Sequence, residues 1–370
     1  MNFYATFSIP FNVGVVTMFV VLIVKYGSWI FGLSAADRMR IVKGIPSRQT
    51  PLAVWEVVRE SLLHRRIFKV NPLLGYMHMS LAFGWFLLIV VGWIETVAYL
   101  GFRYVPLHGH VFFKYFATEL PHKPVFDFLM DLLLLFVLSG VTLAFGKRIY
   151  SQAMGMHRTT RHVLGDRIAL SVLWLIFPAR LLAESITCAL HGGGGFLTGT
   201  IGEWMAHHVN PIVLQTLYEP LWWAYSICLG LFFIVLPFSR YMHIFTEIPL
   251  IFLRRYKLHS TEKEGSFDRF QTDACSRCGI CIDPCQLQSE LGIDDVQSVY
   301  FLRDRRYNHL RQSVANNCLM CGRCEQRCPV GIELNTLRLN SRDTMRNTPD
   351  EKRYEYFQGV DRSAGEGRVG

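Results

Sequence analysis

Two runs of cysteines in the last third of the chain constrain its fold more than any other feature. The first reads C-S-R-C-G-I-C-I-D-P-C and ends at Cys285, and the second reads C-L-M-C-G-R-C-E-Q-R-C-P and ends at Pro329. Both have the spacing C-x2-C-x2-C-x3-C, which is the ligand pattern of a pair of [4Fe–4S] clusters. Eight of the ten cysteines lie in these runs, so the pattern accounts for most of the cysteine content.

The same pattern assigns each cysteine to a cluster, because the fourth cysteine of each run reaches across to the other cluster. One cluster is predicted to bind Cys275, Cys278, Cys281 and Cys328, and the other Cys285, Cys318, Cys321 and Cys324. Zinc ribbons use two C-x2-C pairs per metal and so do not explain runs of this kind. Disulfides are disfavoured because such series are typical of metal sites in a reduced compartment.

One detail separates this region from compact bacterial ferredoxins. Pro329 follows its cysteine as usual, but Pro284 precedes Cys285, and 32 residues separate the two runs. That gap contains a predicted helix over 294–311. The region resembles instead the α-helical dicluster ferredoxins found as the ferredoxin-type subunits of heterodisulfide reductase and as the iron–sulfur subunits of succinate dehydrogenase.

The residues before about 250 have a different character. Long apolar runs dominate there, whereas the chain is polar and charged from about 254 onward, although 51% of all residues are hydrophobic. Apolar stretches of about 20 residues are long enough to cross a bilayer as helices. Five such spans are predicted, over 11–33, 72–100, 125–145, 163–190 and 212–237.

The distribution of Lys and Arg predicts the orientation of these spans. The connections 34–70 and 146–162 are rich in Lys and Arg, whereas 191–211 contains none. Basic loops stay on the cytoplasmic side. We therefore expect the N-terminus outside, the cysteine runs in the cytoplasm and the protein in the cytoplasmic membrane. The net charge of +9 is explained by these loops, and no nucleic-acid partner is expected.

Two histidines are predicted at the inner ends of spans. His78 lies near the cytoplasmic end of the second span, and His243 lies just beyond the fifth. Paired His residues on facing helices are a common way to hold haem in membrane proteins. With the five-span layout, this arrangement resembles the nitrate reductase gamma subunit family, which includes the membrane subunits of heterodisulfide reductase and of the Dsr complex. The resemblance implies that His78 and His243 bind an inner haem b.

The resemblance also predicts the organisation of the whole chain. It implies an all-α protein with a five-span cytochrome b-like domain over 1–250, a helical ferredoxin domain over 265–343 and a polar tail over 344–370. This combination resembles the Qmo membrane subunit with its two halves in the opposite order. The gamma-subunit family holds an outer haem with two further His, but the matching positions here are Leu88 and Tyr225. A second haem would need other ligands, for which His122 and His208 are candidates.

Ionisable residues within the outer half of the spans form another candidate site. Charges in a bilayer are costly and usually functional. Arg180, Glu184, Glu95 and Glu219 are candidates for a quinone and proton site, while the alternative is packing between helices. Arg180 and Glu184 are also spaced to pair on one helix face.

These features predict an electron-transfer subunit rather than a complete enzyme. Electrons would pass between membrane quinone and a cytoplasmic partner through haem b and two clusters. A heterodisulfide-reductase-like or flavin/iron–sulfur subunit is the expected catalytic partner, and other membrane subunits fit the same scheme. The direction of electron flow stays open. The alternatives are a membrane-anchored ferredoxin without haem and a redox sensor.

Overall fold

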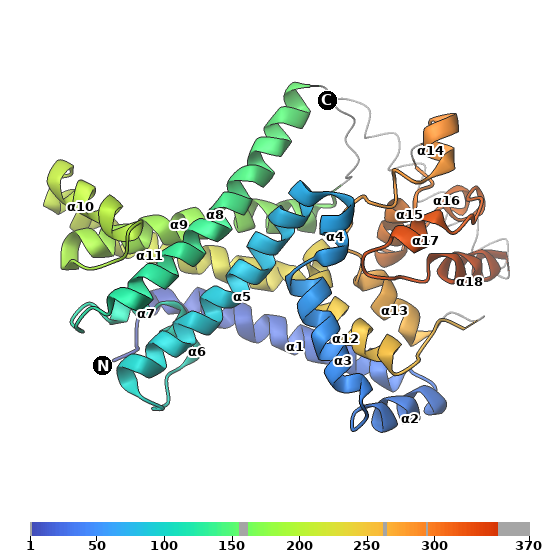
Figure 1. Ribbon diagram of the computed structural model, residues 1–370, viewed down its shortest axis with the longest axis horizontal. Helices are drawn as coiled ribbons and strands as arrows, with labels where there is room; N and C mark the ends of the chain where they lie inside the picture. The colour runs from blue at the N-terminus through green and yellow to red at the C-terminus, as the bar shows by residue number, and fades with distance from the viewer. Residues whose placement is uncertain (1, 155–161, 262–264, 294, 347–370) are drawn as a thin grey trace. The chain divides into compact units, whose positions relative to one another are not determined.

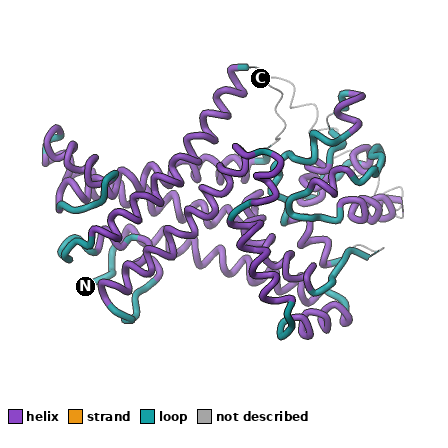
Figure 2. The backbone as a smooth tube through the Cα atoms, viewed as in Figure 1, coloured by secondary structure: helices purple, strands orange, loops and turns teal. Residues whose placement is uncertain are grey.

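The computed structural model describes residues 2–154, 162–261, 265–293 and 295–346. Within them every regular element is a helix (Figure 2). Two compact units are present: unit 1 comprises Met1–Ile23 with Leu62–Tyr241, and unit 2 comprises Val24–Ser61 with Met242–Gly370. The boundary at Ile23 falls inside the first long helix, α1 (Ile9–Phe31). The predicted tail over 344–370 lies outside the described residues from 347 onward.

Unit 1 holds the first part of α1, the other four long helices and the connections between those four (Figure 1). After the short helix η1 (Thr6–Ser8) and the first part of α1, its helices are α4 (Arg65–Val70), α5 (Pro72–Leu100), α6 (Leu107–Val111), α7 (Phe113–Phe116), α8 (Pro124–Ala153), α9 (Leu164–His191), α10 (Thr198–His208), α11 (Pro211–Val235) and η3 (Leu236–Phe238). Helix α5 packs beside α8, and α9 packs against α10 and α11.

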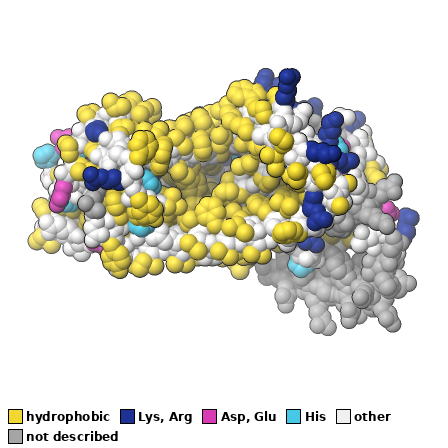
Figure 3. All heavy atoms as spheres, turned by 90° about the horizontal axis from the view of Figure 1, so that it is seen from below, with side chains coloured by type: hydrophobic (Ala, Val, Ile, Leu, Met, Phe, Trp, Pro, Cys, Tyr) yellow, Lys and Arg dark blue, Asp and Glu magenta, His cyan; other side chains and the backbone are white. Residues whose placement is uncertain are grey.

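The five predicted spans are confirmed as helices long and apolar enough to cross a membrane. Their bounds are Thr6–Phe31, Pro72–Leu100, Pro124–Ser151, Leu164–His191 and Pro211–Phe238. Apolar side chains cover much of the face seen in Figure 3, and Ile23, Val125 and Ile212 on the long helices are examples that are exposed. Soluble proteins rarely expose apolar surface on this scale. The five helices therefore fit a multi-pass membrane protein.

Local sequence explains where two of the spans begin. Asn71 precedes α5, and its side chain accepts a hydrogen bond of 3.0 Å from the Leu74 amide. Asn210 precedes α11 and accepts one of 2.9 Å from the Ile212 amide. Each Asn is followed by Pro, which suits the first helical position because its missing N–H would be unpaired there.

Small residues set the approach of α1 to α11 in unit 1. A Cβ added at Gly14 would lie 2.4 Å from the Gly230 carbonyl oxygen, and one at Gly230 would lie 2.2 Å from the Pro10 carbonyl oxygen. The Phe11 amide also donates to the Ser226 hydroxyl at 3.3 Å. Close backbone contact through small residues is a common way to pack helices in lipid.

Unit 2 is built around the cysteine runs. After the last part of α1, its helices are α2 (Ala35–Gly44), α3 (Gln49–Val57), α12 (His243–Arg255), α13 (Ser266–Asp273), α14 (Gln286–Leu291), α15 (Ser298–Arg306), α16 (Gln312–Asn316), α17 (Arg323–Arg327) and α18 (Leu334–Arg346). The short helices η2 (Val58–Leu62) and η4 (Arg240–Met242) lie at the boundaries of the units. Helix α12 packs against α3 and α13, and α18 packs against α16 and α17.

The helix predicted over 294–311 is shorter in the structure, because α15 covers Ser298–Arg306 and residue 294 lies outside the described residues. Its Val299 and Tyr300 form a small core with Ile282, against which Cys281 packs. The helix therefore joins the segment of the first cysteine run to the rest of unit 2.

Candidate metal centre and membrane sites

The two cysteine loops share one backbone conformation. In each run the residue before the second cysteine and the glycine after it have positive φ: Arg277 (56°) and Gly279 (84°) in the first, Met320 (52°) and Gly322 (75°) in the second. Non-glycine residues rarely adopt positive φ, and such turns point backbone amides toward one side. The Met320 amide donates to Cys318 Sγ at 3.3 Å, so one of these amides already faces a ligand sulfur.

The structure brings Cys328 to the first cysteine run, as the predicted ligand exchange requires. Cys328 lies within electrostatic reach of Cys275 and Cys278, and Cys281 lies within reach of all three. Arg306 holds the start of this run by donating to the Cys275 carbonyl oxygen at 3.2 Å. These four thiols therefore lie near one another in unit 2.

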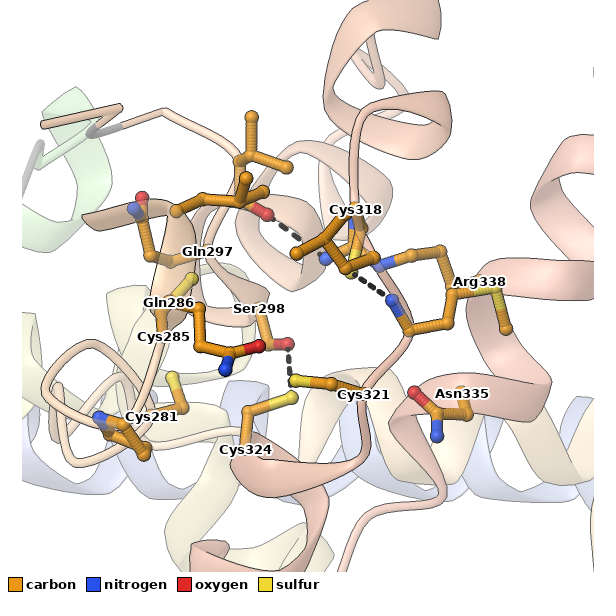
Figure 4. Close-up of a pocket in the computed structure, with 15 residues that line it drawn as sticks. Cys281, Cys285, Gln286, Gln297, Ser298, Cys318, Cys321, Cys324, Asn335 and Arg338 are labelled. Carbon is orange, nitrogen blue, oxygen red and sulfur yellow. Dashed lines mark hydrogen bonds between the residues drawn. The ribbon is translucent and has the colours of Figure 1, made fainter. Parts of the chain in front are cut away.

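The other four predicted ligands line a second pocket, of about 430 Å³ and partly open to solvent. Figure 4 shows Cys285, Cys318, Cys321 and Cys324 around it, with Cys281 at its edge. Cys285 comes from the first run and the other three from the second. The structure thus groups the cysteines three-plus-one in both places, while their ligation of iron stays a prediction.

Burial governs the protonation of these thiols. Burial is the main cause that raises the pKa of Cys278 to about 11, and burial with the neighbouring Cys278 and Cys275 thiols raises the pKa of Cys328 to about 12. A metal ligand must be the thiolate, so bound iron would supply the charge that displaces these protons. Among the described residues, no three His, Cys, Asp or Glu side chains converge as ligands of a single ion.

Two residues that the cysteine spacing did not predict touch the second pocket. The Ser298 hydroxyl donates to Cys324 Sγ at 3.1 Å, and the Arg338 guanidinium lines the pocket beside the cysteines. Both lie outside the cysteine runs, so spacing alone carried no signal for them. Figure 4 shows that they approach from different elements, Ser298 at the start of α15 and Arg338 on α18.

The predicted haem ligands fall in different units, and the structure adds a third histidine. His78 lies on α5, and its ring stacks on the ring of His64, with centroids 5.4 Å apart and planes at 23°. His64 is buried and has a positive φ of 51° just before α4. His243 begins α12 in unit 2. His64 was not predicted, because it lies outside the spans and its contact with His78 depends on the turn before α4.

The candidates for a second haem are not brought together. The His122 ring packs against Gly193, where an added Cβ would lie 2.0 Å from the ring. His208 is exposed on α10, stacks on Trp204 with centroids 5.1 Å apart, and has its Nδ1 at 2.8 Å from the Trp204 carbonyl oxygen. His122 and His208 thus have separate surroundings within unit 1.

The four predicted quinone-site residues divide among three places. Arg180 and Glu184 form a buried ion pair of 2.9 Å on α9. Glu219 accepts a hydrogen bond of 2.7 Å from the Tyr115 hydroxyl. Glu95 lines a small pocket that is partly open to solvent, and it lies within electrostatic reach of Glu184.

The pocket at Glu95 also contains basic and titratable groups. Lys114 lines it and forms an ion pair of 2.9 Å with Asp127, and His122 and His191 lie on its wall. Burial alone would lower the pKa of Lys114, but Cys188, Asp127 and Glu184 raise it overall above its ordinary value. Lys114 was not predicted as a site residue, because it lies in the connection between two spans.

Asp131, another acid within a span, has a structural role. Its carboxylate accepts hydrogen bonds from the Leu197 and Thr198 amides, at 2.7 and 2.9 Å, and from the Thr198 hydroxyl at 2.8 Å. These bonds cap the start of α10, whose first amides have no partner within the helix.

Comparison with known proteins identifies one part of the chain. Residues 271–332 match the family described as 4Fe-4S dicluster domain. All eight cysteines of the two runs lie inside this match. No curated protein and no solved structure matches the chain. The chain is thus a membrane-anchored protein that carries a 4Fe-4S dicluster domain, and it has the character of an electron-transfer protein.

Proposed function

We propose that this chain is the membrane subunit of a respiratory redox complex, which passes electrons between the quinone pool and a cytoplasmic catalytic partner. Quinol would be oxidised at the pocket of unit 1 that Glu95 lines. Haem b and two [4Fe–4S] clusters, held by the candidate His and Cys ligands, would supply the one-electron carriers between this pocket and the partner. The partner is a heterodisulfide-reductase-like or flavin/iron–sulfur subunit. In this proposal the spans lie in the cytoplasmic membrane with the dicluster domain in the cytoplasm, since the basic connections flank that side.

The observation that carries the proposal is a continuous connection within unit 2 between a candidate haem ligand and a cluster ligand loop. Helix α12 begins at His243 and ends at Arg255. Near its end, Arg254 donates to the Val330 and Gly331 carbonyl oxygens at 2.5 and 2.9 Å, directly after Cys328 and Pro329. A helix of this length spans about 20 Å. A simple anchor has no need for a His at one end of such a helix.

The haem would be held by His78 and His243, a pair proposed from their positions in the chain. Bound haem supplies a one-electron carrier between quinol and the clusters. The ring of His64, which lies beside that of His78, makes this residue a second candidate partner for His78.

The outer pocket supports the quinol part of the proposal. Oxidation of one quinol releases two electrons and two protons, so the ring needs neighbouring groups that bind its oxygens and accept protons. Lys114 is placed to bind an oxygen, and Glu95 to accept a proton, because both line the same pocket. The buried Arg180–Glu184 pair lies close enough to influence the charge of Glu95.

The first test is a pyridine haemochrome assay with iron and sulfide analysis of the purified membrane protein. The proposal expects haem b beside about eight irons, four for each of two clusters. His78→Ala should remove the haem, and comparison of His243→Ala with His64→Ala identifies the second ligand. His309→Ala is the matched control, since that ring is exposed and lies outside the spans. About eight irons with no haem would reject the proposal and leave a membrane-anchored ferredoxin.

The quinol step needs a separate measurement. In protein that contains haem, reduction of the haem by a short-chain quinol should be slowed by Glu95→Gln and by Lys114→Met. Reduction by dithionite should stay unchanged in both variants, because dithionite does not use the pocket. Equal rates with quinol in the wild type and both variants would place the quinol site elsewhere.

A further inference from the structure

Arg338 is a buried cation without a carboxylate partner among the described residues. Only 1% of its surface is exposed. Its Nη1 donates to the Val314 carbonyl oxygen and its Nη2 to the Val296 carbonyl oxygen at 3.1 Å. The guanidinium also lies 4.4 Å from the ring centroid of Phe301. Carbonyl dipoles and a ring face do not neutralise a charge, and an uncompensated buried charge is strongly destabilising.

The missing negative charge is available in the adjacent pocket. Arg338 lines the pocket of Cys285, Cys318, Cys321 and Cys324, and it lies within electrostatic reach of three of these sulfurs (Figure 4). An iron–sulfur cluster with four thiolates is an anion, so this pocket would hold the partner that Arg338 lacks.

Two arginines that hold the other cluster's ligand segments are paired differently. Arg306, which donates to the Cys275 carbonyl oxygen, forms an ion pair of 2.8 Å with Asp273. Arg254, which donates beside Cys328, lies 3.5 Å from Glu56. Arg306 thus has a carboxylate partner, and Arg254 shares the carboxylate of Glu56 with Arg255. Arg338 has no such carboxylate among the described residues, so a negative charge in its pocket would have to balance it.

A second group that stabilises negative charge faces the same pocket. The Ser298 hydroxyl donates to Cys324 Sγ at 3.1 Å. Ser298 is the first residue of α15, and Val296 and Gln297 line the pocket with it. The start of a helix carries a partial positive charge, so it acts in the same direction as the hydroxyl and the guanidinium.

We propose that Arg338 is the built-in counter-ion of the cluster bound by Cys285, Cys318, Cys321 and Cys324, and that with Ser298 it raises the reduction potential of that cluster. One added electron takes the cluster and its thiolates from a net charge of minus two to minus three. A fixed cation and a hydrogen bond to sulfur stabilise the more negative state, so they favour the reduced cluster. No proton moves, because the guanidinium stays protonated.

This positioning role for Arg338 and Ser298 rests on one part of the proposed function, namely that the four cysteines bind a cluster. It does not depend on whether the protein also binds haem. Its consequence is that this cluster accepts an electron more readily than it would without the two side chains.

The test is a potentiometric titration of the full-length protein in detergent, with dithionite as reductant and electron paramagnetic resonance as the readout. Cys321→Ser identifies the signal of the cluster in question. Arg338→Gln should lower the reduction equilibrium of that cluster at least tenfold, which is 59 mV for one electron. Arg338→Lys should restore most of the loss, and Ser298→Ala should give a smaller decrease in the same cluster. The other cluster should not shift.

Arg342→Gln is the matched control for a purely structural role of Arg338. Arg342 lies one turn further along α18 and donates to the Ala315 and Cys318 carbonyl oxygens at 2.9 and 2.7 Å. It supports the same loop but does not line the pocket. A shift in Arg342→Gln as large as in Arg338→Gln would overturn the proposal.

Iron content separates the remaining outcomes. If Arg338→Gln loses the cluster, its potential cannot be measured, and Ser298→Ala becomes the test because it leaves the loop contacts of Arg338 intact. An unchanged reduction potential of the cluster in Ser298→Ala then rejects the proposal. If the wild-type protein itself contains no iron–sulfur clusters, the function proposed above fails with it. That result is recognisable from the iron count before any variant is titrated.

Discussion

Arg180 and Glu184 form a buried ion pair of 2.9 Å, one helical turn apart on α9. Glu95 and Tyr225 lie within electrostatic reach of Arg180. The resemblance to the gamma-subunit family predicts a ligand of an outer haem at the position of Tyr225, where this chain has no histidine. In unit 1 Tyr225 instead lies within electrostatic reach of the buried Arg180.

The ion pair gives the first prediction. Glu184→Ala should destabilise the protein by about 3–5 kcal/mol, because it leaves the buried Arg180 charge without its partner. Replacing both residues, as Arg180→Met with Glu184→Leu, should recover most of this loss. The measurement is thermal unfolding of the purified protein in detergent. Equal losses in the single and double variants would contradict the interpretation.

The sequence was sufficient to predict the parts of the fold that depend on local pattern. Apolar runs of sufficient length located all five spans, because a bilayer imposes a length on any helix that crosses it. The dicluster domain was equally accessible, since one loop holds three ligands at fixed spacing. Each span and each three-cysteine loop can be recognised from a short, continuous stretch of sequence.

The surroundings of the candidate sites depend on contacts between distant segments. Ser298 lies 26 residues from Cys324, and Arg338 lies 24 residues from the Val314 carbonyl that it holds. No spacing rule joins such residues, because their contacts follow from how α15 and α18 pack. The stacking of His64 on His78 depends in the same way on the turn before α4.

A buried glutamate supports the proposed connection from α12 to the cluster loop. Glu56 on α3 lies 2.5 Å from Arg255 and 3.5 Å from Arg254. Glu56→Ala should destabilise unit 2 by about 2 kcal/mol, because hydrogen bonds to charged groups contribute on this scale. It should also increase hydrogen exchange at Val330 and Gly331, whose carbonyls Arg254 holds. Hydrogen exchange followed by mass spectrometry measures this effect.

The matched control for Glu56 is Glu290→Ala, which removes an exposed carboxylate from α14 in the same unit. Its stability and exchange should stay at the wild-type level, since exposed charges contribute little. Increased exchange confined to α3, with Val330 and Gly331 unchanged, would show that Arg254 does not transmit the loss.

The glycines of the cysteine loops give a third prediction. Gly279→Ala or Gly322→Ala should cost about 1–2 kcal/mol and reduce iron content, because these residues have positive φ and their amides belong to the ligand turns. The measurement is iron per protein after purification without oxygen.

Gly292→Ala provides the control for these loop variants. Gly292 has a φ of 64° at the end of α14, and nothing lies within 4 Å of an added Cβ. It should show a similar loss of stability with full iron content. Iron loss as large as in the loop variants would mean that backbone strain anywhere in the domain releases the clusters.

The crossing of α1 and α11 gives the last prediction. Gly14→Ala should destabilise unit 1 by about 1–3 kcal/mol, since the new methyl group would meet the Gly230 backbone at 2.4 Å. Gly27→Ala, on the same helix, meets nothing within 4 Å and should be neutral or slightly stabilising. Thermal unfolding in detergent compares the two variants directly. Equal stability of both variants would show that the two helices separate readily, and that close backbone contact is not what holds α1 against α11.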